Sequence, residues 1–265
     1  MATALAQPAR RLLSLDVMRG TIMVLLTLES TGLYEHLLTA SDQTALNALF
    51  LQFFHHPWNG LRFWDLIQPG FMYMAGVSMA YSLQKQSQMG YTWARSFQKI
   101  LKRCGWLFFW GVLDYAVRPG GLSFELWDVL TQLSFTTLVA FLIFQWKPAY
   151  QVGVCVLLLL LTEVLYRFTH VAGFDQPFTD QKNFGNYVDL LLMNKINSGG
   201  WVAINCIPTA VHTIAGALTG KWLVQQPQAP LKKILVWCGI SLMLGYALDF
   251  AGNTQQAPTQ RRQRE

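Results

Sequence analysis

Charged residues are scarce in this chain of 265 residues, and that scarcity argues against a soluble protein. Only 13% of the residues are Asp, Glu, Lys or Arg, whereas soluble domains contain about 25%. Apolar residues make up 52% of the sequence, with ten Trp and seventeen Phe among them. This composition is typical of a protein that crosses a membrane several times.

Cysteine is also rare, and the sequence has no Gly-rich phosphate loop of the P-loop type. The cysteines lack the CxxC spacing and the neighbouring histidines that are typical of a metal site. We therefore expect no metal, and four buried, unpaired thiols at Cys104, Cys155, Cys206 and Cys238.

The net charge of +6 indicates membrane orientation rather than nucleic-acid binding. Most Lys and Arg residues lie in short connections that would share one side of a membrane, and the positive-inside rule makes that side cytoplasmic. The N-terminus is then cytoplasmic, and the loop that contains His55 faces outward. We predict an integral membrane protein.

Seven apolar segments approach the length of about twenty residues that a helix needs to cross a bilayer. They predict an all-α fold, a polytopic membrane bundle of seven helices. An N-terminal arm occupies 1–13, the membrane domain 14–252, and a tail of different composition 253–265. A prematurely ended reading frame or a natural disordered tail would explain that tail. The predicted helices lie near 15–36, 63–84, 101–118, 127–146, 149–166, 201–224 and 232–252.

The connection 167–200 is long for a membrane bundle and rich in Asp and Asn. Such a segment is either a lid over a substrate site on the outer side or a plain solvated loop.

Residues 55–66 hold the densest group of side chains able to move a proton. The side chain of a histidine ordinarily exchanges its proton near neutral pH, so a residue such as His55 suits a general base or a transient acyl carrier. Asp65 is placed to orient its ring, as the acid does in a catalytic triad. Asn59 suits donation to an oxyanion. Trp58 offers a flat face to a sugar, although an interfacial aromatic belt explains it equally.

Polar residues inside apolar helices are functional candidates, because a charge in hydrocarbon costs several kcal/mol. On the predicted topology, Glu29 and Asp65 lie toward the outer side. Asn205 lies one turn into the sixth predicted helix from the same side. We expect these side chains to converge on an outward-facing cavity.

Four segments together resemble the heparan-α-glucosaminide N-acetyltransferase family and its bacterial relatives. They cover the chain in order from residue 14 to residue 224. The segments are Ser14-Leu15-Asp16-Val17-Met18-Arg19-Gly20; His55-x-x-Trp58-Asn59-Gly60 with Asp65-Leu66, Pro69, Gly76 and Ser78; Asp128-Val129-Leu130-x-Gln132-Leu133; and Ile207-Pro208-Thr209 with Thr213-Ile214, Gly216 and Gly220-Lys221.

This resemblance implies a transmembrane acyltransferase that moves an acetyl group from cytosolic acetyl-CoA to an extracytoplasmic saccharide. It places the protein in a bacterial inner membrane and the catalytic histidine at His55. The family has an asparagine near the outer end of its first helix, where this chain has Ser30 beside Glu29. Family members are also longer, with helices beyond the last residue of this chain.

The expected partners are a lipid bilayer, a saccharide acceptor and a second copy of the chain. Two other functions stay open at this point. One is a membrane carrier without transferase chemistry, and the other is an inactive, truncated fragment.

Overall fold

The structure, a computed structural model, describes residues 12–42, 44–57, 60–117, 123–226 and 231–261, and every regular element within them is helical. The prediction of an all-α fold is confirmed. The helices are α1 (Leu13–Ser30), α2 (Leu33–Ala40), α3 (Ala45–Phe50), α4 (Ile67–Gln88), α5 (Trp93–Ala116), α6 (Val129–Leu142), α7 (Pro148–Phe168), α8 (Phe184–Met193), α9 (Cys206–Gln225) and α10 (Leu231–Arg261), with short 3-10 turns η1 (Leu51–Phe53), η2 (Phe63–Leu66) and η3 (Ala203–Asn205).

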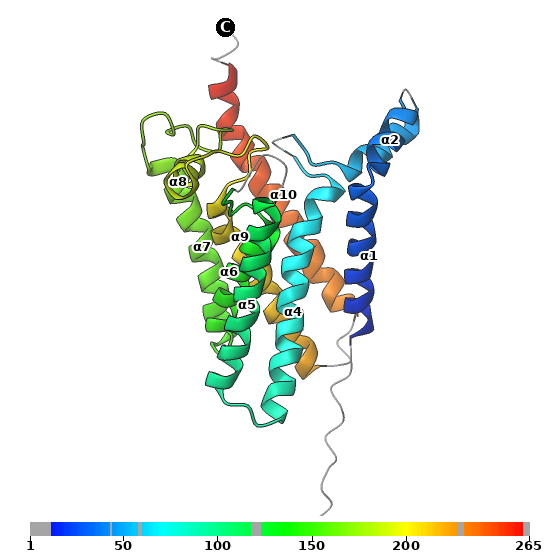
Figure 1. Ribbon diagram of the computed structural model, residues 1–265, viewed down its shortest axis with the longest axis vertical. Helices are drawn as coiled ribbons and strands as arrows, with labels where there is room; N and C mark the ends of the chain where they lie inside the picture. The colour runs from blue at the N-terminus through cyan, green and yellow to red at the C-terminus, as the bar shows by residue number, and fades with distance from the viewer. Residues whose placement is uncertain (1–11, 43, 58–59, 118–122, 227–230, 262–265) are drawn as a thin grey trace, which may run out of the picture. The chain divides into compact units, whose positions relative to one another are not determined.

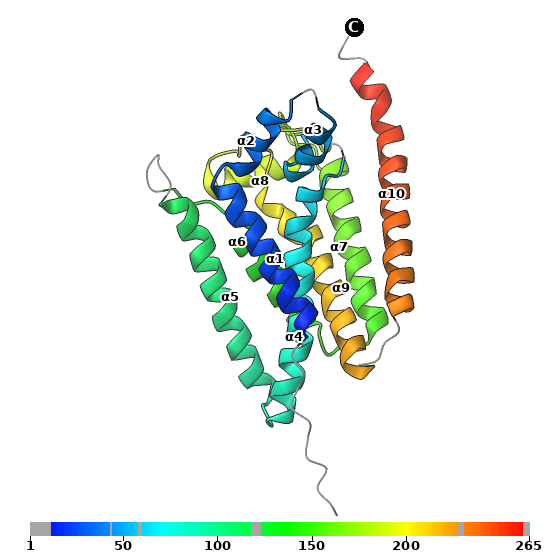
Figure 2. The same ribbon diagram turned by 90° about the vertical axis from the view of Figure 1, so that its right-hand side faces the viewer.

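The chain divides into two units, residues 1–221 and 222–265. In the first unit, α5 packs along α6, and α4 packs against both α1 and α6 (Figure 1). The short helices α2, α3 and α8 gather at one end of these long helices (Figure 2). The second unit holds the last turn of α9 and all of α10.

Each of the seven predicted segments overlaps one helix of 14 residues or more, but the bounds differ. Helix α5 begins at Trp93 rather than near 101, α6 is shorter than the predicted 127–146, and the first helix is also shorter than expected. The sequence predicted one helix over 15–36, whereas α1 ends at Ser30 and α2 begins at Leu33. Gly32 adopts a left-handed conformation with φ of 71°. A glycine reaches this conformation at little cost, and it ends the helix there.

A helix must be both long and apolar to cross a bilayer. Among the described residues, α7 is the one helix that is long and apolar enough, by length and composition, to span a membrane. The helix α6 is apolar but has only 14 residues. In α1, the charges of Asp16, Arg19 and Glu29 interrupt the apolar run.

Glycines bring α4 and α9 into direct backbone contact. A Cβ atom at Gly76 would overlap the carbonyl oxygen of Thr213, and one at Gly216 would overlap the carbonyl oxygen of Tyr73. Only glycine permits so close an approach. Two segments of the proposed family resemblance therefore meet in the core of the bundle.

Hydrogen bonds join the other segments of the resemblance. The Arg19 guanidinium of α1 donates to the Ser78 hydroxyl of α4. The side-chain amide of Gln68 in α4 donates to Oε1 of Gln132 in α6 at 2.9 Å, and Gln132 is buried. These contacts fix α1, α4 and α6 relative to one another.

The connection 167–200 is folded, so its interpretation as a plain solvated loop is wrong. It contains α8, whose first residues are capped by the Asn183 side chain, which accepts from the Asn186 backbone amide at 3.2 Å. Asn186 and Asp189 are completely buried. The segment is therefore packed against other elements of the first unit, because Asp189 accepts hydrogen bonds from Trp127 and Ala203.

Two further expectations are corrected in the second unit. The helix α10 continues to Arg261 and so runs through most of the tail 253–265, where the sequence predicted no regular structure. Cys238 is exposed rather than buried, and in the first unit Cys155 and Cys206 are only partly buried, whereas Cys104 is buried as expected. All four cysteines are unpaired, as predicted.

The contact between α4 and α9 generates a stability prediction. Replacing Gly76 with Ala should lower the free energy of unfolding by about 1–3 kcal/mol, because the added methyl group forces the two backbones apart. Gly153 of α7 is the control, since a Cβ atom there meets nothing within 4 Å. Denaturant unfolding in detergent should show G153A unchanged or slightly stabilised. Equal destabilisation of the two variants would contradict this account of the contact.

Candidate active site

An imidazole and a carboxylate form the centre of the site. His55 Nδ1 lies 2.8 Å from Asp65 Oδ1. A carboxylate only accepts hydrogen bonds, so Nδ1 carries the proton and donates it. In the neutral ring, Nε2 is then the basic nitrogen. The contact predicted between these two residues is present, and their catalytic roles stay predictions.

Backbone amides hold the other carboxylate oxygen. Asp65 Oδ2 accepts from the N–H of Arg62 at 2.8 Å and from the N–H of His56 at 3.3 Å. The Arg62 guanidinium in turn donates to the carbonyl oxygen of His55 at 2.8 Å. These four residues form a closed ring of hydrogen bonds that fixes the orientation of the imidazole. Arg62 had no such role in the sequence-based prediction.

Aromatic packing anchors both ends of this loop. Phe53, just before His55, stacks on Tyr34 with ring centroids 4.6 Å apart, and Tyr34 meets the edge of Trp64 at 5.4 Å. Tyr34 and Trp64 are buried. The aromatic cluster of Tyr34, Phe53 and Trp64 therefore packs against both ends of the loop. Helix α4 begins at Ile67, shortly after Trp64.

His55 lines a cavity of about 450 Å³. Its ring stands edge-on to Trp201, with centroids 5.2 Å apart. The walls come from the ends of four helices and from the segment before α9. The remaining lining residues are Met23, Leu26 and Glu29 of α1; Trp64, Ile67, Gln68 and Phe71 of η2 and α4; Tyr115 of α5; and Trp127, Asp128, Val129, Leu130 and Leu133 in and before α6.

Two carboxylates share this cavity with His55. Glu29 lines it from the last turn of α1, as predicted, and the outward orientation of the cavity stays a prediction. Asp128 also lines it while capping α6, because its Oδ1 accepts from the Leu130 N–H at 2.6 Å. The cavity therefore has acidic groups on two sides and apolar walls between them.

Other predicted site residues lie apart from this cavity. The hydroxyl of Ser30 donates to the Thr27 carbonyl on α1 and is exposed. Asn205 lies in η3 and is not among the lining residues. Asp65, which lies in η2, does not line the cavity either, so the predicted convergence of Asn205 and Asp65 on it is wrong. The role of Ser30 in substrate binding stays a prediction. Trp58 and Asn59 lie outside the described residues.

Sequence reasoning missed the aromatic side of the cavity and its support. Trp127 Nε1 donates to Asp189 Oδ2 at 2.9 Å, and the Ala203 N–H donates to Asp189 Oδ1 at 2.9 Å. Asp189 of α8 thus holds Trp127 and the segment after Trp201 together. The only sequence signal was an acidic residue within an apolar stretch of 167–200.

The two buried or half-buried aspartates have opposite pKa shifts. Burial raises the pKa of Asp65, but the hydrogen bonds from the Arg62 amide, the His55 ring and the His56 amide outweigh it, so the pKa is lowered overall. Burial dominates at Asp189 and raises its pKa to about 6, against the lowering effect of its two N–H donors.

Among the described residues, no group of three or more His, Cys, Asp or Glu side chains is placed to hold a metal ion.

No family model matches this chain, and no curated protein matches it either. The resemblance to the heparan-α-glucosaminide N-acetyltransferase family therefore stays a prediction.

The lowered pKa of Asp65 predicts a loss of stability in acid. Its carboxylate stabilises the folded state above the unfolded-state pKa of about 4, and this contribution is lost as the pH falls through the lower, folded-state pKa. The difference in unfolding free energy between the wild type and D65N should be constant near neutral pH and shrink below about pH 4. Denaturant unfolding at a series of pH values measures it, and a difference that persists in strong acid would count against the pairing.

Asp189 should show the opposite trend. Its raised pKa means that its stabilising contribution is complete below the unfolded-state pKa of about 4 and is lost as the pH rises through the folded-state value of about 6. The free energy of unfolding of D189N should therefore lie furthest below that of the wild type at acidic pH. The same unfolding series, run on D189N, would refute this if the gap widened as the pH rose.

Proposed function

We propose that this protein is a membrane-bound acyltransferase that moves an acetyl group from acetyl-CoA to an extracytoplasmic saccharide. The observation that carries the proposal is the hydrogen bond from His55 Nδ1 to Asp65, at the edge of a cavity that Glu29 also lines. That bond leaves Nε2 as the basic atom of a half-exposed imidazole.

The surface of the helices supports a place in the bilayer. Large apolar side chains are exposed along α5 and α7, including Trp106, Phe109, Trp110, Leu157 and Leu160. Soluble proteins rarely expose apolar surface on this scale. Polar side chains are buried instead, as expected where the solvent is lipid. We propose that the seven long helices α1, α4, α5, α6, α7, α9 and α10 cross the membrane.

The His55 loop and α8 belong on the outer side in this proposal. Basic residues lie at the opposite ends of the helices: Lys85 near the end of α4, and Arg95 and Lys99 near the start of α5. The positive-inside rule assigns those ends to the cytoplasm. The cavity then opens toward the compartment that holds the saccharide.

The proposed reaction needs one base. His55 Nε2 removes a proton from the amine or hydroxyl of the saccharide as that group attacks the thioester carbon of acetyl-CoA. The carbon–sulfur bond breaks, and the proton returns to the sulfur, so the products are the acetylated saccharide and free CoA. Asp65 stabilises the imidazolium that forms in between. Glu29 is placed to accept a hydrogen bond from the saccharide.

A second route uses the same nitrogen as a nucleophile. His55 Nε2 then takes the acetyl group first and releases CoA before the saccharide reacts. The two routes differ in one measurement. Release of CoA in a burst without any saccharide indicates the acyl-imidazole route, and its absence indicates the general-base route.

Mutation of the imidazole tests the proposed function. Replacing His55 with Ala should lower acetyl transfer in membranes by about 10²–10⁴-fold, because the reaction loses its base. His170→Ala is the matched control, since His170 is an exposed histidine of the 167–200 connection that does not line the cavity. Transfer should be unchanged in that variant. Full activity of H55A in radiolabelled acetyl transfer would end the proposal.

A further inference from the structure

One polar side chain that lines the His55 cavity, Gln68, has no role in the proposed reaction. It lies in the first turn of α4, three residues after Asp65. Its amide nitrogen Nε2 donates to Oε1 of Gln132 on α6 at 2.9 Å. Its own Oε1 accepts no hydrogen bond from the described residues and is not sealed away from solvent. The side-chain carbonyl of Gln68 is therefore an accessible acceptor in the wall of the cavity.

A chain of hydrogen bonds fixes which end of the Gln68 amide is left for the cavity. Gln132 Nε2 donates to the Trp127 carbonyl at 3.4 Å, and a backbone carbonyl can only accept. Gln132 therefore turns its Oε1 toward Gln68, which must meet it with Nε2. Reversing one or both amides would set two acceptors or two donors against each other. The atom that remains for a ligand is thus the acceptor Oε1 of Gln68.

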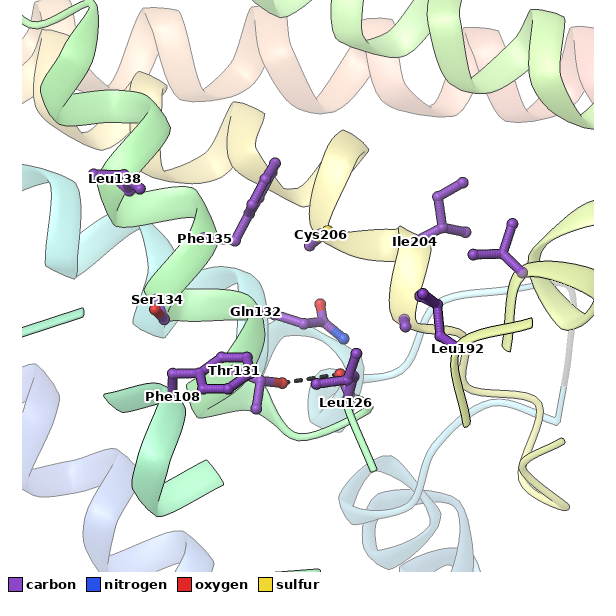
Figure 3. A pocket seen from close by; sticks show the side chains of 12 residues that line it. Phe108, Leu126, Thr131, Gln132, Ser134, Phe135, Leu138, Leu192, Ile204 and Cys206 are labelled. Carbon is purple, nitrogen blue, oxygen red and sulfur yellow. Dashed lines mark hydrogen bonds between the residues drawn. The ribbon is translucent and has the colours of Figure 1, made fainter. Parts of the chain in front are cut away.

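The surroundings of Gln132 offer its amide little else to bind. Gln132 is buried and does not line the His55 cavity. It lies among the side chains of a separate, largely apolar cavity, where Phe135 and Leu138 are its neighbours on α6 (Figure 3). The hydroxyls of Thr131 and Ser134 in the same lining each donate to a backbone carbonyl. Losing a hydrogen bond in such surroundings is costly, so the Gln132 amide keeps its orientation.

The far end of this chain is also held in place. Trp127 is buried, and its Nε1 donates to Asp189 Oδ2 on α8 at 2.9 Å. The hydrogen bonds thus run from α8 through the start of α6 to α4, and they end at Gln68. Small-molecule sites are mostly apolar and contain a few precisely placed polar groups that fix the orientation of the ligand. Gln68 has the position and the support of such a group.

We infer that Gln68 determines specificity for the saccharide: its Oε1 accepts a hydrogen bond from a hydroxyl next to the group that is acetylated, and Gln132 is the positioning residue that orients it. His55 serves the reacting group itself. Ile67 and Phe71, which also line the cavity from α4, are apolar, so a hydroxyl here would lose its hydration without the Gln68 acceptor. This inference rests on the proposed function and adds a requirement on its acceptor.

Sugar binding tests the contact without requiring any activity. The probes are methyl glucosaminide and its monodeoxy analogues, each of which lacks one hydroxyl, titrated calorimetrically into the purified full-length protein in nanodiscs without acetyl-CoA. Q68M keeps the length of the side chain and removes the acceptor. It should weaken binding of methyl glucosaminide about tenfold, because one hydrogen bond is lost. The analogue that lacks the contacted hydroxyl should bind Q68M and the wild type equally, since there the bond is already absent.

Two further glutamines separate orientation from stability. In Q132M the Gln68 amide is free to turn, and with two orientations available the same sugars should bind about twofold more weakly, again except for that one analogue. Gln86 is the control, because it is a buried glutamine of α4 that bonds Ser82 at 3.0 Å and does not line the cavity. Q86M should bind every sugar as the wild type does. Denaturant unfolding of each variant shows whether it is folded.

The pattern over the analogues decides the outcome. Equal weakening of every analogue in Q68M would overturn the inference, because it indicates a distorted cavity or a contact with the acetyl donor. Unchanged binding in Q68M, or a wild type that binds none of the sugars, would overturn it as well. Acetyl transfer to the same probes separates this from the proposed function. Selective binding without any transfer leaves the role of Gln68 intact and contradicts the acyltransferase, whereas transfer that H55A abolishes and Q68M leaves unchanged does the reverse.

Discussion

The hydrogen bond between His55 and Asp65 is the interaction on which the account of this site depends. It selects the protonated nitrogen of the imidazole, and two backbone amides keep the carboxylate in place. Such a bond forms only if the nine residues between His55 and Asp65 fold back on themselves. The aromatic cluster of Tyr34, Phe53 and Trp64 makes that possible, because it gives a polar loop a rigid base. The chemistry proposed for the outer face thus rests on packing between α2 and the start of α4.

The rest of the bundle brings distant segments to the same place. Glycine contacts hold α4 against α9, and the Gln68–Gln132 pair holds α4 against α6. Because α1, α4 and α6 all contribute walls of the His55 cavity, these contacts determine its shape. Asp189 holds Trp127, another residue of the cavity wall, in place. Its carboxylate is buried, and its pKa is raised to about 6. The two hydrogen bonds to this carboxylate fix Trp127 and Ala203 relative to α8.

Much of this architecture could be predicted from the sequence, because apolar runs of about twenty residues report helices directly. The site was predicted in part. His55, Asp65 and Glu29 were found because titratable side chains are conspicuous in an apolar chain. Asn205 and Asp65 do not line the cavity on which they were expected to converge, because they lie in the short turns η3 and η2, which periodicity does not reveal. Trp201 and Asp189 were missed because their importance arises from contacts across more than a dozen residues. The fold of 167–200 was missed for the same reason, as its apolar and polar residues show no simple period.

The central claim is that His55 Nε2 meets the thioester of an acyl donor inside the cavity that Glu29 lines. An experimental structure of the full-length protein in lipid, bound to a non-reactive acetyl-CoA analogue, tests this most directly. The account predicts the acyl carbon within hydrogen-bonding range of His55 Nε2, with the Nδ1–Asp65 bond intact. An analogue bound with its acyl group on another face of the bundle, or an imidazole turned away from Asp65, would contradict it.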